Sequence, residues 1–557
     1  MFCDKKNINL LTAYLIEYGI KNVVVCPGSR NAPIIHNLHN HSYFKLYPVT
    51  DERSAAFVAI GISIATQSPC AVCVTSGTAL LNTLPAVAEA YYRHTPLLII
   101  SADRPPERIG QLDGQTLIQN KALEPYAYST QLCEPTDAAE EKECIFQIEK
   151  ALIALTENGI QPVHINIPIS EPLFQFVSPS LPKVSVHQKT PIENNDTTEL
   201  DNTDIDTIKK AQLPVLIMGQ FDFQELPYEE LDKNQQLLVL PEIVANTSLS
   251  WRTTLWEELF NKLNLQPDVV IHIGGNMVNK QLKLQLQASM QCKVIRIEPG
   301  KDSPDTFKHL EKVIRNKELP ILKKLQEILP SNKNVASAQR VLDRLKEQLV
   351  EKNGYKLTKF SDLGIMQMIS QNLLKLEDEY ALHLANSSSI RNATYFFTSK
   401  EQKIYCNRGV NGIEGSLSTA VGYSLAYKGK VFIFIGDLSF FYDNNALWNN
   451  MLTENLRIIL FNNGGGQIFK RLKGLDSSPA LDHYIAANHT YTAKGIAESY
   501  NIEYYSAQSY NELSNHLPRL IKNNNLRPIL LEVFTNQTDN EIDLKNIHTF
   551  YQQLIIE

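Results

Sequence analysis

The sequence predicts an α/β protein of three doubly wound parallel-sheet domains, of which the two outer ones are homologous. The chain has 557 residues, a length typical of two or three domains rather than of a single hydrophobic core. Apolar strand-like runs alternate with helical segments, a pattern that favours parallel sheets covered by helices on both faces. Several motifs also recur in the same order in the two halves of the chain, which indicates a duplication.

The repeat can be followed through four elements. SRNAP around Arg30 corresponds to IRNAT around Arg391, 361 positions later. At the same offset, residues 59–65 and 420–426 both match A-x-G-x-S-x-A. The strand-like runs AVCVTSG and VFIFIGD come next, followed by LLIIS and RIILF, with the offset reduced by two residues. Because the matches keep one order, we expect duplicated units with right-handed crossovers.

The segment between the two copies differs from both of them in sequence. Residues 178–205 are polar and include the run ENNDTTELDNTD, which is typical of a linker. The runs LPVLIMGQ, QQLLVLPE, DVVIHIGG and KVIRIEP predict the buried strands of a further α/β domain. A charged helical stretch at about 330–355 leads into the second copy. The predicted domains are therefore 1–180, 200–335 and 355–557.

Composition narrows the classes of partner. The net charge of -7 gives no overall bias toward nucleic acid or membrane surfaces. We find no signal peptide and no apolar run long enough to cross a bilayer, so we expect a cytoplasmic protein. The eight cysteines are scattered, which suits a reducing compartment. Cys70 and Cys73 form a C-x-x-C within a strand-like run, so we interpret them as buried strand residues rather than a redox pair.

A cation site is predicted at the end of two strands in the second copy. Asp437 follows the run VFIFIG, and Asn463 follows RIILF and Asn462. Parallel strands present their carboxyl ends at one edge, where α/β folds bind ligands. A carboxylate, an amide oxygen and a backbone carbonyl such as that of Gly465 suit Mg²⁺, with phosphate oxygens and water completing the octahedron. The run Gly464–Gly466 would let the backbone approach phosphate closely.

Gly436-Asp437 and Asn462-Asn463 together resemble the cofactor motif of the thiamine-diphosphate-dependent enzymes, which begins Gly-Asp-Gly and ends Asn-Asn. Leu438 stands where most of that superfamily has the second glycine. The resemblance implies a C-terminal diphosphate-binding domain, an N-terminal pyrimidine-binding domain, and bound thiamine diphosphate with Mg²⁺ or Mn²⁺. The cofactor-binding residues that it implies in the C-terminal domain are Gly436, Asp437, Leu438, Ser439, Asn463, Gly465, Gln467, Ile468 and Phe469. By their sequence alone, Ile468 and Phe469 could equally begin a helix that faces the core.

Two further cofactor contacts follow from the resemblance. Glu52, in VTDERSAAFVAIG, matches the glutamate that hydrogen-bonds the aminopyrimidine ring and promotes deprotonation of the thiazolium carbon. We expect the apolar helix after it to bury it, which favours the neutral donor form; read alone, it could be a glutamate that stabilises a helix N-terminus. Ile413 matches the bulky residue that holds the cofactor in its V shape, although core packing is the alternative.

The sequence resembles more narrowly the 2-succinyl-5-enolpyruvyl-6-hydroxy-3-cyclohexene-1-carboxylate synthases of menaquinone biosynthesis. The matching motifs are CPGSRNAP, SADRPPE, NRGVNGIEG, GDLSFFYDNNAL and NNGGGQIF, which cover both outer domains and not the middle one. GDLS is this family's own form of the motif. In that family 2-oxoglutarate is decarboxylated and the resulting carbanion adds to isochorismate, so a transferase with two acidic small-molecule substrates is implied.

Arginines in loop-like sequence suit such substrates, because guanidinium groups bind carboxylates bidentately. A surface or structural ion pair is the ordinary alternative for any one of them. The residues that the family implies in contact with substrate or intermediate are Ser29, Arg30, Arg104, Gln115, Lys280, Ser387, Arg391 and Arg408. The resemblance also implies a homodimer or homotetramer with shared active sites, since the glutamate of one subunit faces the diphosphate domain of another.

Three other functions compete with this interpretation. Another thiamine-diphosphate carboligase or 2-oxo acid decarboxylase would keep Glu52, Asp437 and Asn463 but would not need so many arginines. A non-catalytic protein that retains the fold would be expected to lose these residues. A nucleotide-binding dehydrogenase is disfavoured, because Gly274-Gly275 lacks the full G-x-G-x-x-G context.

Overall fold

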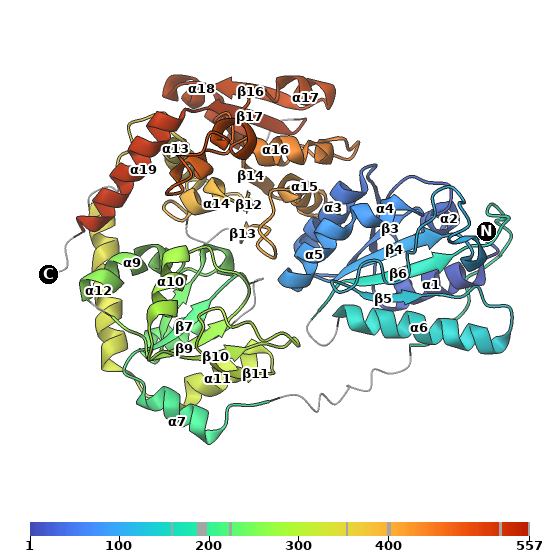
Figure 1. Cartoon of the computed structure of the whole chain (residues 1–557), viewed down its shortest axis with the longest axis horizontal. Coiled ribbons are helices and arrows are strands. Elements are labelled where there is room, and N and C mark those ends of the chain that lie inside the picture. Colours follow the sequence, from blue (N-terminus) through green and yellow to red (C-terminus); the bar gives the residue numbers. More distant parts are fainter. Residues whose placement is uncertain are drawn as a thin grey trace.

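The computed structural model describes residues 1–156, 160–186, 198–221, 226–263, 265–351, 355–397, 403–522 and 526–554. Three α/β units lie around a common junction (Figure 1), and each is built on an all-parallel sheet. The predicted fold class is therefore confirmed. The middle of the predicted linker, residues 187–197, lies outside the described residues.

The first unit occupies the N-terminal part of the chain and has the sheet order β2-β1-β3-β4-β6-β5. Its elements are α1 (Lys6–Glu17), β1 (Asn22–Val25), α2 (Ala32–Asn40), β2 (Lys45–Pro48), α3 (Glu52–Thr66), β3 (Cys70–Val74), α4 (Thr78–Asn82), α5 (Leu84–Arg93), β4 (Leu97–Asp103), β5 (Tyr128–Gln131), α6 (Ala138–Thr156) and β6 (Val163–Pro168). Cys70 and Cys73 are fully buried in β3 and are free thiols, as predicted.

The central unit has the sheet order β11-β10-β9-β7-β8. Its elements are α7 (Asn202–Lys210), β7 (Pro214–Met218), α8 (Tyr228–Lys233), β8 (Leu238–Pro241), α9 (Trp251–Leu263), β9 (Val269–Ile273), α10 (Lys280–Ala288), β10 (Lys293–Ile297), β11 (Leu310–Ile314), α11 (Glu318–Ile328) and α12 (Lys333–Glu351). The four predicted strands are all present. The sequence did not predict β11, whose charged residues Glu311 and Lys312 interrupt its apolar pattern.

The predicted linker is too long at its C-terminal end, because α7 already begins at Asn202. Asp201 accepts a hydrogen bond from the backbone N–H of Asp204, and the Asp204 side chain accepts one from the N–H of Asp201. This reciprocal capping starts a helix within a polar run that resembles linker sequence.

The third unit repeats the first. Its sheet order β13-β12-β14-β15-β17-β16 matches the first sheet strand for strand when both are numbered along the chain. Its elements are α13 (Asp362–Leu373), β12 (Tyr380–Leu384), α14 (Ser388–Ala393), β13 (Lys403–Tyr405), α15 (Ser416–Ala426), β14 (Lys430–Gly436), α16 (Asp437–Tyr442), β15 (Leu456–Asn462), α17 (Lys494–Ser499), β16 (Glu503–Ala507), α18 (Tyr510–Ile521), β17 (Ile529–Phe534) and α19 (Gln537–Gln552).

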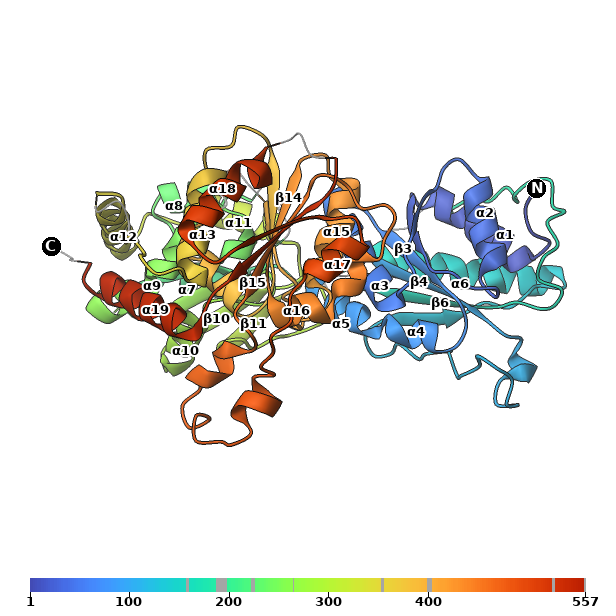
Figure 2. The ribbon, with the colours of Figure 1, turned by 90° about the horizontal axis from the view of Figure 1, so that it is seen from above.

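The two copies of A-x-G-x-S-x-A lie on α3 and α15, which pack against each other (Figure 2). A Cβ on Gly61 would lie 2.1 Å from the Thr419 carbonyl oxygen, and one on Gly422 would lie 2.0 Å from that of Val58. Only glycine allows backbones this close. Around the crossing, Ile60, Ala420 and their neighbours form one apolar core that joins the outer units.

The loops after the strand ends of both outer sheets project to the same side of the molecule. In Figure 2 these are the light-blue segment after β4 and the orange-red segment after β15.

Near the C-terminus, Leu554 packs into the core of the central sheet with residues such as Val215. None of the helices in the described part of the chain is both long and apolar enough to cross a membrane.

Candidate active site

Asp437 and Asn463 lie together at the carboxyl edge of the third sheet. Strands β14 and β15 are parallel neighbours, with Gly436 opposite Phe461, so the residues after them are adjacent. Asp437 is the first residue of α16, and its Oδ2 accepts hydrogen bonds from the backbone N–H of Asn463 (3.1 Å) and Gly465 (2.9 Å). The two residues are therefore adjacent, as the order of the strands predicted.

The side chains at this edge fit a hard cation. Oδ1 of Asn463 is buried and has no hydrogen-bond partner, while its Nδ2 donates to Asp362 Oδ2 at 3.1 Å. The Asp437 carboxylate is also buried, and this burial raises its pKa. An acceptor without a donor beside a desolvated carboxylate is an arrangement that a divalent cation would stabilise.

The backbone beside Asp437 is shaped for close approach. Gly464 and Gly465 have φ values of 78° and 139°, which few other residues adopt. A Cβ on Gly436 would meet nothing within 4 Å, so the space above the end of β14 is open. Farther along the loop, Gln467 Nε2 donates to the Asn463 carbonyl oxygen at 2.7 Å. Ile468 and Phe469 lie half-buried in the short 3₁₀ helix Gln467–Arg471 and not in the core.

A second loop reaches the same edge from the end of β13. Ile413 is 41% exposed, so it is not an ordinary core residue. Its carbonyl oxygen accepts a hydrogen bond from the buried Ser439 hydroxyl of α16. Leu438, between Asp437 and Ser439, is half-buried. The loop that carries Ile413 is thereby attached to the helix that carries Asp437.

Glu52 lies in the first unit, at the first position of α3. We expected the helix to bury it, and this was wrong: its side chain is only half-buried, because the apolar surface of α3 faces α15 instead. Glu52 lines a cavity of about 370 Å³ with Gln115 and residues 75–79. Gln115 is exposed and has φ 57°. No hydrogen bond or ion pair between described residues joins Glu52 to Asp437 or Asn463.

The four arginines form two groups, and one of them, Arg391, lies in helix α14 and not in a loop as we expected, because the chain turns into a helix directly after Ser387. Arg30 and Arg104 lie beside Asp103 at the edge of the first sheet. Arg30 is buried and donates to Glu171 Oε1 at 2.8 Å and to the Ile169 carbonyl oxygen at 3.2 Å. Arg104 donates to the Gly114 carbonyl oxygen at 3.0 Å. Ser29, next to Arg30, is exposed.

The other group is at the edge of the third sheet. Repulsion from Arg408 adds to desolvation in lowering the pKa of Arg391, so the two guanidinium groups are neighbours. Arg408 is half-buried, and its Nε is buried without a partner. Ser387, just before α14, has φ 76°, a strained value for serine that is common at functional sites. Lys280 is exposed in the first turn of α10.

Comparison with known proteins is consistent with this geometry. The family described as "Thiamine pyrophosphate enzyme, N-terminal TPP binding domain" matches residues 6–123, and its C-terminal TPP binding domain matches residues 387–533. A 2-succinyl-5-enolpyruvyl-6-hydroxy-3-cyclohexene-1-carboxylate synthase of Bacteroides thetaiotaomicron is 39% identical, over 100% of both chains. The synthase of the same name from Flavobacterium johnsoniae is 36% identical over 95% of both chains.

The chain belongs to this synthase family. It is accordingly a thiamine-diphosphate-dependent transferase. Among solved structures, benzoylformate decarboxylase from Polynucleobacter necessarius superposes with a TM-score of 0.71 and covers 96% of this chain and 99% of that one. At 15% identity, this likeness concerns the fold alone.

Sequence reasoning missed three polar residues around the edge of this synthase's third sheet. His489 Nε2 lies 3.3 Å from Asp437 Oδ2, Asp362 orients the Asn463 amide, and Glu89 of α5 binds the loop that contains Arg408. Each reaches the site from a distant part of the chain. None belongs to a motif, so only the folded structure could identify them.

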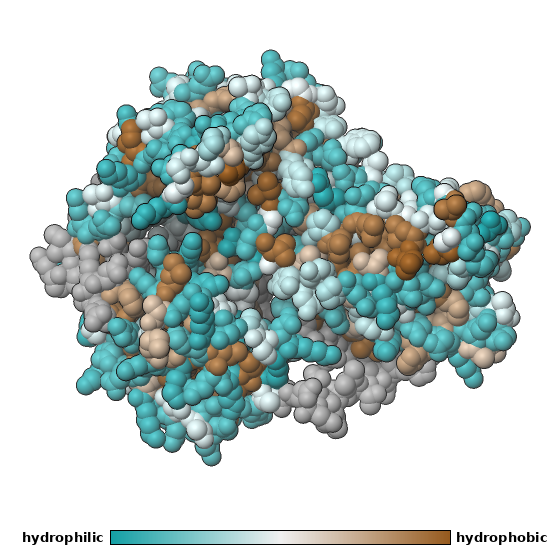
Figure 3. Space-filling model, in the orientation of Figure 1, coloured by the Kyte–Doolittle hydropathy of each residue, from teal (hydrophilic) through white to brown (hydrophobic). Residues whose placement is uncertain are grey.

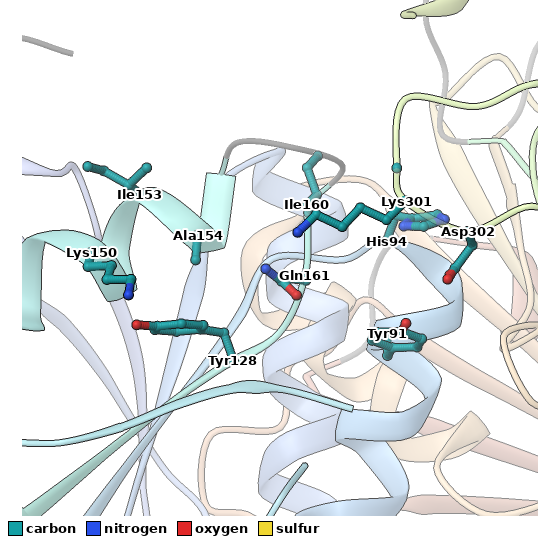
Figure 4. A pocket seen from close by; sticks show the side chains of 11 residues that line it. Tyr91, His94, Tyr128, Lys150, Ile153, Ala154, Ile160, Gln161, Lys301 and Asp302 are labelled. Carbon is teal, nitrogen blue, oxygen red and sulfur yellow. The ribbon is translucent and has the colours of Figure 1, made fainter. Parts of the chain in front are cut away.

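A separate cavity of about 300 Å³ lies between the first and central units (Figure 4). Tyr91 and His94, at the end of α5, face Lys301 and Asp302 of the central unit across it, and Tyr128 and Lys150 line its other side. None of the residues that the sequence predicted for the site lines this cavity.

Proposed function

We propose that the chain decarboxylates 2-oxoglutarate and adds the remaining four-carbon unit to isochorismate, giving 2-succinyl-5-enolpyruvyl-6-hydroxy-3-cyclohexene-1-carboxylate and CO₂, a step of menaquinone biosynthesis. The observation that carries the proposal is the pair formed by the buried Asp437 carboxylate and the unpartnered Oδ1 of Asn463, in a chain of this family. Thiamine diphosphate, when bound, supplies the electron sink that decarboxylation requires.

In this proposal the edge of the third sheet would hold a divalent cation and the diphosphate of the cofactor. Asp437, Asn463 and the Gly465 carbonyl oxygen bind Mg²⁺ or Mn²⁺, which prefer oxygen ligands of this kind. Gly436, Leu438, Ser439 and Gln467 contact the diphosphate side of the cofactor. Ile413, Ile468 and Phe469 provide apolar surface against its rings and exclude water from the reacting carbon.

Glu52 has the proton-transfer role. Its carboxyl group holds and returns a proton at the aminopyrimidine ring, which a half-buried acid in an open cavity can do once the ring covers it. Covering by the ring would supply the burial that α3 does not provide. Gln115, which lines the same cavity, would contact the intermediate or a substrate.

The two groups of arginines bind the acidic substrates. Arg391 and Arg408 repel each other, which a bound carboxylate would relieve. Arg30 and Arg104 contribute from the first unit, where the ion pair of Arg30 with the exposed Glu171 can be exchanged for a substrate carboxylate. Ser29, Ser387 and Lys280 complete the proposed set of polar contacts.

The complete site requires two copies of the chain. The cavity beside Glu52 is lined wholly by residues of the first unit, and none of the cation ligands contributes to it. Apolar side chains also gather over the first sheet (Figure 3), and Leu112, Ile118 and Trp448 are among the exposed large apolar residues. Apolar surface of this kind favours association. We therefore propose a cytoplasmic homodimer or homotetramer with domains 1–180, 200–335 and 355–557, and without nucleic-acid or membrane partners.

A direct assay tests the proposed function. Purified protein is mixed with thiamine diphosphate, Mg²⁺, 2-oxoglutarate and isochorismate, and the products are followed by mass spectrometry. We expect CO₂ together with a product that joins isochorismate to the succinyl unit. CO₂ release from a different 2-oxo acid, without any isochorismate-dependent product, would make the protein another carboligase or decarboxylase.

A further inference from the structure

All three units meet at residues 406–412, which we call the junction loop. From the central unit, Gln220 Nε2 donates to the Cys406 carbonyl oxygen at 2.7 Å. Asn276 Nδ2 donates to the carbonyl oxygens of Arg408 and Gly409 at 2.6 and 2.8 Å. Within the third unit, Asn386 Nδ2 donates to the carbonyl oxygens of Asn407 and Gly412. The carbonyl groups of the loop are thus held from two sides.

The first unit holds the N–H groups of the same loop through one residue, Glu89 of α5. Its Oε1 accepts from the Gly409 N–H and its Oε2 from the Val410 N–H, both at 2.8 Å. The side chain is 1% exposed, so these bonds form away from water. Two consecutive amides bound by the two oxygens of one buried carboxylate fix both the position and the orientation of the loop.

The loop lies so close to α5 that residue 409 must be small. A Cβ on Gly409 would lie 2.4 Å from the Glu89 carbonyl oxygen and 2.9 Å from its Oε2. The contact between Glu89 and the loop therefore depends on both partners. It can be broken independently from either side, through Glu89 or through Gly409.

The same loop carries Arg408, next to Gly409. The Arg408 guanidinium donates to Asn386 Oδ1 at 3.1 Å and to the Met277 carbonyl oxygen at 2.8 Å, and its Nε is left without a partner. We propose that Glu89 is a positioning residue: by holding the Gly409 and Val410 amides, it directs Arg408 toward a substrate carboxylate. This inference rests on the proposed function, in which Arg408 binds an acidic substrate.

The charges around Glu89 are consistent with this role. Arg93, one turn later on α5, donates to the Cys406 carbonyl oxygen at 3.1 Å, so α5 binds the junction loop twice. Burial raises the pKa of Glu89, while the two amides and the nearby Arg93 and Arg408 oppose that rise. Within the described part of the chain, the hydrogen bonds of the Glu89 carboxylate go to the junction loop, and Glu89 is not among the residues that line the Glu52 cavity.

The test compares three variants of the full-length enzyme. Glu89→Gln keeps the side-chain volume but presents an N–H to one of the two amides, and Gly409→Ala pushes the loop from the other side. Asp268→Asn is the matched control, because Asp268 also binds two consecutive amides, those of Gln212 and Leu213, within the central unit. The readouts are KM and kcat for both substrates, thiamine-diphosphate affinity by calorimetry, and hydrogen exchange of the junction loop.

We expect Glu89→Gln and Gly409→Ala to raise KM for an acidic substrate about tenfold or more, the effect of losing a charge-assisted contact. Exchange at residues 409 and 410 should accelerate, and cofactor affinity should stay within about threefold. Asp268→Asn should leave KM unchanged. The inference is overturned if KM and loop exchange do not change in Glu89→Gln, or if Asp268→Asn has the same kinetic effect. If the wild type is inactive with these substrates, the proposed function is refuted instead. Hydrogen exchange of the junction loop would then still test whether Glu89 binds the Gly409 and Val410 amides.

Discussion

At the scale of single residues, the proposed cation site depends most on the orientation of the Asn463 side-chain amide. Asp362 Oδ2 accepts from Asn463 Nδ2, which leaves Oδ1 of Asn463 directed away from Asp362 and without a partner. The other carboxylate oxygen of Asp362 accepts from the Thr535 hydroxyl at 2.6 Å. The sequence predicted Asn463 from its strand and motif, but it could not predict Asp362, which lies about a hundred residues earlier at the start of α13.

We predict that Asp362→Asn weakens Mg²⁺ binding about 10- to 100-fold, the usual effect of losing a group that orients a metal ligand. The new amide can accept only one of the two donors, so the Asn463 side chain is free to turn its Nδ2 toward the cation. Mn²⁺ binding followed by electron paramagnetic resonance measures this directly. Thr535→Val is the control, since it removes a different partner of Asp362, and an equal loss in both variants would show that Asn463 orientation is not the cause.

Glu52 offers a second prediction at this scale. Glu52→Gln should bind thiamine diphosphate with near wild-type affinity but lose activity by about 100-fold or more, because an amide cannot transfer the proton. Cofactor binding by calorimetry and turnover by CO₂ release separate the two effects. Retention of full activity would remove Glu52 from the mechanism.

At the scale of elements, the repeated A-x-G-x-S-x-A motif has a packing explanation. Gly61 and Gly422 allow α3 and α15 to cross in close contact, so the motif reflects the contact between the two copies. The buried strands were predictable because an uninterrupted apolar run such as VFIFIG is typical of a strand that is covered on both faces. The edge strand β11 was not, because it is only partly buried and the charged residues Glu311 and Lys312 interrupt its apolar pattern.

Glu242, directly after β8, is an acid whose titration should change the free energy of unfolding. Burial raises the pKa of Glu242 to about 7, although the Asn279 N–H and Arg408 oppose the rise. Between its unfolded pKa near 4.5 and this value, the folded chain keeps a proton that the unfolded chain releases. The free energy of unfolding therefore falls as pH rises through this window.

Glu242→Gln should remove that dependence. Relative to wild type, the variant should gain about 3 kcal/mol in free energy of unfolding between pH 4.5 and pH 8. Urea unfolding of both proteins at the two pH values measures the gain. A stability difference that is the same at both pH values would show that Glu242 titrates normally.

At the scale of the whole molecule, the proposed site residues are divided among the three units of the chain. The sequence predicted the duplication, the order of units and the pairing of Asp437 with Asn463. It could not predict that Arg391 and Arg408 would be close neighbours, or that Glu89 would join the first unit to the junction loop. These relations depend on how the units pack, which no local pattern records.

The central claim is that each active site takes Glu52 from one chain and Asp437 with Asn463 from another. The most direct test mixes two inactive variants, Glu52→Gln and Asp437→Ala, after dissociating and reassociating the subunits. Asp437→Ala alone should lose Mg²⁺-dependent cofactor binding. In a mixed dimer one site carries both substitutions and the other carries none, so a mixed dimer should have about half of the wild-type activity. Because random reassociation makes about half of the dimers mixed, the mixture should recover about a quarter of the wild-type value. Activity no greater than the sum of the separate variants would contradict the shared site and place Glu52 and Asp437 in the same chain's active site.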